Sequence, residues 1–330
     1  MPRFVSFCEK ECNSCFHNLF IAIIIDIPSG FVYNKSVCGL YRIGKEEKPM
    51  DATLIRQLQI HAVKIRMGII EGVYNAKSGH PGGSLSIADL LTYLYFTRMN
   101  VYPDKPDFAE RDRLVLSKGH TAPALYSALA ERGFFPMEEM KTLRRIGSRL
   151  QGHPCIHLPG VDMSSGSLGQ GISAACGMAL AGKHRSDNYR VYTILGDGEI
   201  EEGQVWEAAM FAAHYGLDNL TAIVDNNGLQ IDGKITEVCS PEPIPDKFAA
   251  FGWKVIQMDA HDFEDIDRAF REAERVTGQP VAIIQHSTKG KGVSFMENQV
   301  GWHGSAPNKE QYEQAMAELT AELKRLEAEA

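Results

Sequence analysis

The residues best suited to bind a ligand are an aspartate between two glycines, Gly196-Asp197-Gly198, and Asn227, which follows Asp197 by 30 residues. Each comes directly after a short apolar run, so each is expected at the end of a strand. The Asp197 carboxylate, the Asn227 amide oxygen and the backbone carbonyl of Leu229 are hard oxygen donors that suit Mg²⁺. The flanking glycines would let the backbone approach a diphosphate closely. Separately, a loop aspartate and an Asn-Gly turn are common, but together they predict a site for a metal ion and a diphosphate.

The elements that would position these residues alternate along the chain. We expect strands at 114–116, 191–195, 220–224, 253–258 and 281–285, and helices at 172–183, 203–215, 263–275 and from Asn308 onward. This order predicts an α/β fold, a doubly wound parallel sheet with helices on both faces. Ligands bind beyond the carboxyl ends of such strands, where this chain places the polar and glycine-rich segments 117–120, 196–198, 225–228 and 286–292.

Composition narrows the class of protein. The 330 residues are 44% apolar and carry a net charge of −8 without any cluster of Lys and Arg, which argues against nucleic-acid binding. The most apolar run, 19–27, is interrupted by Asp26 and is too short to span a bilayer, and no signal peptide is evident. The seven cysteines form no disulfide framework. We therefore expect a cytoplasmic protein that does not bind membranes.

The first 49 residues differ from the rest. A clean helical pattern begins only after Met50, so we expect 1–49 to be an atypical extension, disordered or wrongly started, and 50–330 to be the functional domain. Cys8, Cys12 and Cys15 have a spacing that can hold an iron–sulfur cluster. Because no barrel pattern follows them, free thiols in a poorly ordered tail are the favoured interpretation.

Seven short segments along the chain match the motifs of one protein family. Over roughly residues 55–310 the chain resembles the transketolases, which implies a thiamine-diphosphate-binding domain of the type that holds the diphosphate. The implied cofactors are thiamine diphosphate and Mg²⁺, with Ca²⁺ or Mn²⁺ as alternatives. The segments that carry the resemblance are 78–83, 116–120, 151–154, 166–171, 196–203, 225–233 and 301–304.

The resemblance assigns roles to single residues. It implies metal ligation by Asp197, Asn227 and the Leu229 carbonyl, and a subunit-interface position for Glu202. The residues expected to line the cofactor are His120, Gly166, Ser167, Leu168, Gly198, Asn227 and His303, with Ser167 standing where the family often has proline. The expected catalytic residues on the substrate side are His80, His153 and His303, since histidine can donate to a developing alkoxide and shuttle protons near neutral pH. The histidines interpreted as structural are His17, His61, His157, His184, His214 and His261, whereas the role of His286 is undecided.

The resemblance also implies a partner. Long transketolases continue into a pyrimidine-binding domain and a C-terminal domain, which carry the glutamate that activates the cofactor and most groups that grip the sugar phosphate. The chain is therefore expected to be the N-terminal subunit of a split transketolase, a transferase in a heterotetramer with a C-terminal subunit. It would move a two-carbon ketol unit from a ketose phosphate to an aldose phosphate in the pentose phosphate pathway.

Two alternatives remain. The chain could belong to a deoxyxylulose-phosphate synthase or a 2-oxo-acid dehydrogenase component, although the three substrate-side histidines favour a transketolase. It could instead be a non-catalytic cofactor-binding subunit, but the intact pair of Asp197 and Asn227 argues against a decayed site. The preferred sugars are not evident from the sequence.

Overall fold

A five-stranded parallel sheet organises residues 50–329, the part of the chain that the computed structural model describes. Its strand order is β1-β2-β3-β7-β6, and each predicted strand is present with its ends shifted by no more than two residues. The bounds are β1 (Arg113–Leu116), β2 (Val191–Gly196), β3 (Leu220–Asn226), β6 (Lys254–Asp259) and β7 (Val281–His286). The predicted α/β fold is confirmed. The predictions for residues 1–49, including the spacing of the three cysteines, lie outside the described residues.

Both faces of the sheet are buried, as expected where helices cover both sides. Side chains alternate along each strand, so that on β2 Tyr192 and Ile194 belong to one hydrophobic core while Val191 and Leu195 belong to the other. The four strands other than β6 are almost entirely buried, which explains why they read as short continuous apolar runs in the sequence.

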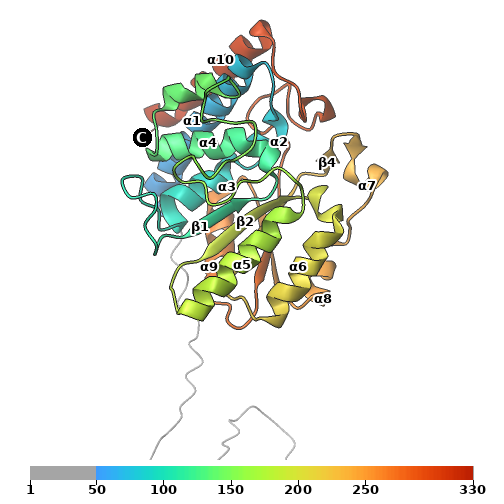
Figure 1. Cartoon of the computed structure of the whole chain (residues 1–330). Helices are drawn as coiled ribbons and strands as arrows, with labels where there is room; N and C mark the ends of the chain where they lie inside the picture. Colours follow the sequence, from blue (N-terminus) through green and yellow to red (C-terminus); the bar gives the residue numbers. More distant parts are fainter. Residues whose placement is uncertain (1–49, 330) are drawn as a thin grey trace, which may run out of the picture. The chain divides into compact units, whose positions relative to one another are not determined.

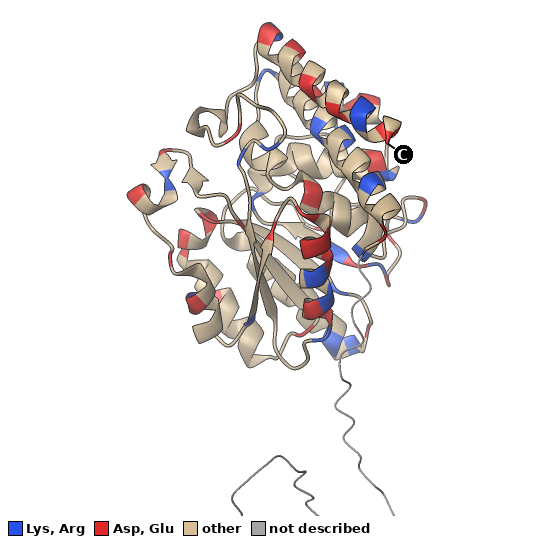
Figure 2. Ribbon diagram, turned by 180° about the vertical axis from the view of Figure 1, so that it is seen from behind, with Lys and Arg blue, Asp and Glu red and all other residues tan. Residues whose placement is uncertain are grey.

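The distribution of the helices follows from the order of the strands. The chain steps across the sheet in one direction from β1 to β2, β3 and β6, and α5 (Gln170–Arg185), α6 (Gly203–His214) and α8 (Ile244–Ala250) pack in one core. It then steps back from β6 to β7 through α9 (Phe263–Glu274), which packs in the other core. Right-handed crossovers require this change of face. Figure 1 shows α5 and α6 in front of the sheet, and Figure 2 shows the charged outer surface of α9 from behind.

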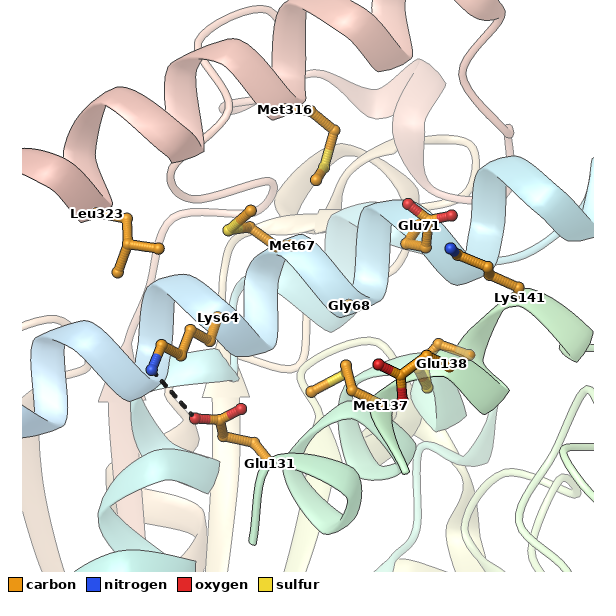
Figure 3. Close-up of a pocket in the computed structure, with 11 residues that line it drawn as sticks. Lys64, Met67, Gly68, Glu71, Glu131, Met137, Glu138, Lys141, Met316 and Leu323 are labelled. Carbon is orange, nitrogen blue, oxygen red and sulfur yellow. Dashed lines mark ion pairs between the residues drawn. The ribbon is translucent and has the colours of Figure 1, made fainter. Parts of the chain in front are cut away.

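The first and last described helices pack along each other on the α9 side of the fold. They are α1 (Ala52–Ala76) and α10 (Lys309–Ala328) (Figure 1). Asp51 caps α1 by accepting a hydrogen bond from the Thr53 amide at 3.0 Å. A capping box of Asn308 and Gln311 begins α10, as the predicted helix from Asn308 requires. A groove of about 350 Å³, lined by Met67, Met137, Met316 and Leu323 among others, lies between these helices and the segment 137–142 (Figure 3).

The remaining elements are short and were not predicted individually. The helices are α2 (Pro81–Leu85), α3 (Ala88–Tyr93), α4 (Ala122–Arg132) and α7 (Ile235–Val238), and β4 (Leu229–Gln230) pairs with β5 (Gly233–Lys234) as a small antiparallel ribbon. Short 3₁₀-helical segments are η2 (Gly119–Thr121), η3 (Met137–Thr142), η4 (Glu199–Glu201) and η5 (Val300–Trp302), and η1 (Leu94–Arg98) is a short π-helical segment. Within residues 50–329, none of the helices has the length and apolar character needed to cross a membrane. The three cysteines of the same range, Cys155, Cys176 and Cys239, carry free thiols.

Candidate functional site

A cavity of about 460 Å³ lies at the carboxyl ends of β1, β2, β3 and β7. Because Gly196 of β2 pairs with Asp225 of β3, the loops that follow these two strands start side by side. Lining the cavity are His80, Gly83, Lys118, His120, His153, Gly166, Leu168, Gly196, Asp197, Gly198, Glu199, Asn227, Leu229, Gln230, Ile231, Lys289 and His303. Segments far apart in the sequence therefore meet in one place.

Most of the predicted site residues line this cavity, and two do not. Ser167 and Glu202 are exposed and do not contribute to the lining. His286, whose role was undecided, lies at a neighbouring hollow that shares Asn227 with the cavity, and its Nε2 is 2.9 Å from Oε1 of Gln257. Four further residues line the cavity without a predicted role, namely Lys118, Glu199, Gln230 and Lys289. Lys118 and Lys289 stand in segments that were expected at strand ends.

The three predicted metal ligands are held by local hydrogen bonds. The carboxylate of Asp197 accepts from the amides of Gly198 at 2.9 Å and Gly228 at 2.6 Å. The side-chain oxygen of Asn227 accepts from the Leu229 amide at 3.1 Å, and the Leu229 carbonyl accepts from Nζ of Lys289 at 2.7 Å. Carboxylate, amide and carbonyl oxygens in one cavity are a donor set that fits Mg²⁺. Residues 50–329 contain no cluster of three His, Cys, Asp or Glu suited to a metal. The three oxygen donors described here would form half of an octahedral shell, which waters or ligand oxygens could complete.

Behind the cavity lies a buried ionic network that was not foreseen. The carboxylate of Asp225 is fully buried and pairs with the ammonium of Lys118. It also accepts hydrogen bonds from Ser86 and Gln285 at 2.7 Å and from Ser287 at 2.5 Å. Burial alone would raise the pKa of Asp225, but the Lys118 ammonium outweighs it and holds this pKa well below its usual range. One carboxylate thus ties together the segments after β1, β3 and β7.

The pKa of Asp197 is shifted in the opposite direction from that of Asp225. Burial raises its pKa to about 6, and the negative charge of Asp225 adds to this rise. A buried carboxylate that is costly to ionise gains from a nearby cation, so this feature fits a metal site. The folded chain holds the proton more tightly than the unfolded chain does. Ionisation of Asp197 therefore lowers stability as pH rises from about 4 to about 6.

We predict that Asp197 titrates with a midpoint near pH 6 in the metal-free chain, because burial and the charge of Asp225 both favour its protonated form. The measurement is carboxyl ¹³C NMR with a chelator present. Asp225→Asn should lower this midpoint, since it removes the negative charge and leaves the Lys118 ammonium unpaired. A midpoint near 4 in the parent chain would contradict the prediction.

Three histidines cluster at the cavity. The ring centres of His80, His120 and His303 are 5.0 to 5.5 Å apart. Burial first, and then nearby cations, lower the pKa of His80 to about 4 and that of His303 to about 3, and the pKa of His120 lies well below 6.5. All three are therefore neutral at pH 7. A neutral ring can both donate and accept a hydrogen bond.

The protonation of His303 is fixed by its neighbour. The Nζ atom of Lys289 lies 3.0 Å from Nδ1 of His303, and an ammonium can only donate, which places the His303 proton on Nε2. Burial lowers the pKa of Lys289 to about 8, so the ammonium still predominates at pH 7. Nδ1 of His80 is buried and has no hydrogen-bond partner among residues 50–329.

Close backbone packing shapes one wall of the cavity. A Cβ at Gly119 would lie 2.7 Å from Oγ of Ser165 and 2.9 Å from the Gly166 amide nitrogen, so no side chain fits there. Gly119 therefore allows the segments that carry His120 and Gly166 to approach each other. The cavity thus combines backbone amides, hard oxygen donors, two lysines and neutral histidines, which together suit an anionic ligand that carries a metal.

Comparisons with known proteins agree with this geometry. Residues 56–326 match the family described as transketolase, thiamine diphosphate binding domain. The chain is 46% identical to one of the subunits of apulose-4-phosphate transketolase from Phocaeicola vulgatus over 275 residues, which cover 83% of this chain and 98% of that protein. It is 47% identical to a 6-deoxy-6-sulfo-D-fructose transketolase subunit of a Clostridium species over 266 residues, 80% of this chain and 97% of that one. The crystal structure of Campylobacter jejuni transketolase matches with a TM-score of 0.75 at 31% identity, covering 82% of this chain and 45% of that chain.

The parallel sheet and the cavity beyond its strand ends, together with these matches, define a thiamine-diphosphate-binding domain. The chain belongs to the transketolase family. It corresponds to the N-terminal, diphosphate-binding part of the fold and spans less than half the length of the full-length transketolases that it matches.

Proposed function

We propose that this chain is the N-terminal subunit of a split transketolase. With a separate C-terminal subunit it transfers a two-carbon ketol unit from a ketose phosphate to an aldose phosphate, using thiamine diphosphate and Mg²⁺. The observation that carries the proposal is the placement of His80, His120 and His303 in one cavity with Asp197 and Asn227. Hydrogen-bonding groups for a sugar and oxygen ligands for a metal thereby share one wall.

The roles of the residues follow from their contacts. Asp197, Asn227 and the Leu229 carbonyl would hold Mg²⁺, and the backbone at Gly166, Leu168 and Gly198 would lie against the cofactor. Thiamine diphosphate supplies the thiazolium carbon that carries the two-carbon unit between sugars. Neutral His80, His153 and His303 would donate hydrogen bonds to the carbonyl and hydroxyl oxygens of the sugar. Lys289 supports this role by keeping the His303 proton on Nε2, the atom that can face a ligand.

The exposed residues at the rim of the cavity support the proposal that a second polypeptide covers the site. Leu168 and Ile231 line the cavity and are 37% and 64% exposed, so two large apolar side chains meet solvent beside the site. Exposed apolar residues beside a ligand site are typical of a surface that another chain covers. Glu202 is exposed next to Gly169 on the same side of the site, which suits its proposed place at the interface. The two relatives that are named as subunits suggest the same division of the enzyme.

The substrate is proposed as a class. The relatives are named for apulose 4-phosphate and 6-deoxy-6-sulfo-D-fructose, which both carry an anionic group at one end of the sugar. A ketose with an anionic end group is therefore the substrate class that we propose. Xylulose 5-phosphate, the donor of the pentose phosphate pathway, is one member of it.

We expect ketol transfer only when this chain is mixed with its C-terminal partner, thiamine diphosphate and Mg²⁺, because the chain alone leaves the apolar rim of the site uncovered. The assay would use ribose 5-phosphate as acceptor and compare xylulose 5-phosphate, apulose 4-phosphate and 6-deoxy-6-sulfo-D-fructose as donors. Each chain alone serves as the control. Transfer by this chain alone, or a mixture that binds the cofactor but acts on none of the three donors, would contradict the proposal.

A further inference from the structure

The loop that follows β7, residues 287–292, carries Lys289 into the cofactor cavity. Lys289 is 2% exposed, and its Nζ contacts the Leu229 carbonyl at 2.7 Å and Nδ1 of His303 at 3.0 Å. The Gly290 amide donates to the Gly82 carbonyl at 2.9 Å, next to the segment that holds His80. The conformation of this loop therefore determines how Leu229 and His303 are presented to a ligand.

Two side chains outside the cavity hold the loop by its backbone. Nε2 of His261 accepts from the Thr288 amide at 2.9 Å, and Nε of Arg66 donates to the Lys291 carbonyl at 3.0 Å. Both side chains meet on Asp89. Its carboxylate accepts two hydrogen bonds from Arg66, at 3.0 and 2.6 Å, and lies 2.7 Å from Nδ1 of His261. We call Arg66, Asp89 and His261 the loop clamp.

The register of the sheet explains why His261 reaches Thr288. Asp259 of β6 pairs with His286 of β7, so the residues two positions beyond each strand end lie beside each other. The loop also passes close to Arg66, because a Cβ at Gly292 would lie 2.8 Å from its Cδ. Gly292 has a φ of +90°, a conformation that glycine adopts at low cost.

The protonation states of the clamp follow from its contacts. Burial would raise the pKa of Asp89, but the charge of Arg66 and the hydrogen bond from His261 hold it well below its usual range. Asp89 is therefore ionised and Nδ1 of His261 donates to it. Nε2 accepts from an amide N–H and so carries no proton. His261 is thus a neutral ring with its proton on Nδ1, and the clamp has one positive and one negative charge.

We propose that the loop clamp positions Lys289 in the cofactor cavity and that His261 is a positioning residue for the site. The cofactor role of Lys289 rests on the proposed function, whereas the hold on the loop does not. Removing the acceptor at Nε2 would leave the Thr288 amide unpaired, and the loop would open more often. Lys289 would then spend less time on the Leu229 carbonyl and on His303.

Two replacements separate the contacts of His261. His261→Asn keeps an amide N–H near the Nδ1 position, so it can still donate to Asp89, but it places no acceptor near Thr288. His261→Gln can place an acceptor at the Nε2 position, so it can still hold Thr288. His286→Gln is the matched control, since His286 adjoins the same loop but contacts Gln257 instead of the loop backbone. Urea unfolding of each variant reports its global stability.

The first readouts need no cofactor. In the metal-free chain, His261→Asn should speed hydrogen exchange at the Thr288 amide and tryptic cleavage after Lys289 by about tenfold, as expected for the loss of one partly buried hydrogen bond. His261→Gln and His286→Gln should stay within about threefold of the parent. Amides of α6 serve as the internal reference. Equal rates in the parent and His261→Asn, or equally fast rates in His261→Asn and His261→Gln, would overturn the proposal.

The last readout connects the loop to the site. In the mixed subunits His261→Asn should lower kcat/KM about tenfold, and in a Lys289→Ala background it should cause no further loss, because both changes act through the same side chain. The positioning role would be overturned if His261→Asn opened the loop without lowering ketol transfer. It would also be overturned if the loss of kcat/KM in the double variant equalled the product of the losses in His261→Asn and Lys289→Ala. An inactive parent mixture would contradict the proposed function instead, since the exchange and cleavage readouts would still report on the clamp.

Discussion

Replacing Asp197 with alanine should lower ketol transfer by the mixed subunits by at least about a hundredfold and weaken binding of thiamine diphosphate with Mg²⁺ to a similar extent. Asp197 is the single carboxylate in the proposed metal shell, and both of its oxygens are already aimed by the amides of Gly198 and Gly228. Without it the metal would keep only neutral ligands from this chain. Calorimetric titration of the cofactor at several Mg²⁺ concentrations would measure the loss of affinity.

The matched control for this change is Asp232→Ala. Asp232 lies five residues after Asn227, is exposed and does not line the cavity, so its replacement should leave binding and transfer within about twofold of the parent. Equal effects of the two replacements, or an Asp197→Ala mixture that retains Mg²⁺-dependent transfer, would contradict the assignment of Asp197 as a metal ligand.

The second large effect concerns stability. Lys118→Met should lower the free energy of unfolding of the metal-free chain by about 3–5 kcal/mol at pH 7, because it leaves the buried carboxylate of Asp225 without its ammonium partner. The pKa of Asp225 is held low in the folded chain, so its contribution is complete above about pH 4 and is lost as pH falls further. Urea unfolding followed by circular dichroism would measure the change.

Lys183→Met provides the comparison, because Lys183 pairs with Asp218 at 2.6 Å where both side chains remain about one-third exposed. Exposed pairs contribute little, so we expect a loss of about 0–1 kcal/mol. Equal destabilisation by the two lysine replacements would show that burial does not set the contribution of the Lys118 pair.

Much of the fold could be predicted because its signals are local. The segments 191–195 and 281–285 become buried strands whose apolar runs carry the information themselves. The helices at 203–215 and 263–275 are found within one residue of the expected ends. By contrast, the ribbon of β4 and β5 has strands of two residues, too short for any period to show.

Site residues could be predicted from the sequence only where they stand in a recognisable local motif. Asp197 and Asn227 stand at the ends of adjacent strands, so their convergence follows from the order of the strands. The pairing of Lys118 with Asp225 joins residues 107 positions apart, and no local pattern reports it. His261 was interpreted as structural for the same reason, since its contact with Thr288 depends on the register between β6 and β7.

The packing of α1 against α10 has a consequence for synthesis on the ribosome. α1 is translated well before α10, the helix that packs along it, and β7 must be inserted between β3 and β6 before the sheet is complete. Pairings between segments so distant in sequence form slowly, and until then apolar surface of the nascent chain stays open to solvent. The apolar face of α1 is therefore covered in full only after α10, more than 200 residues downstream, has been made.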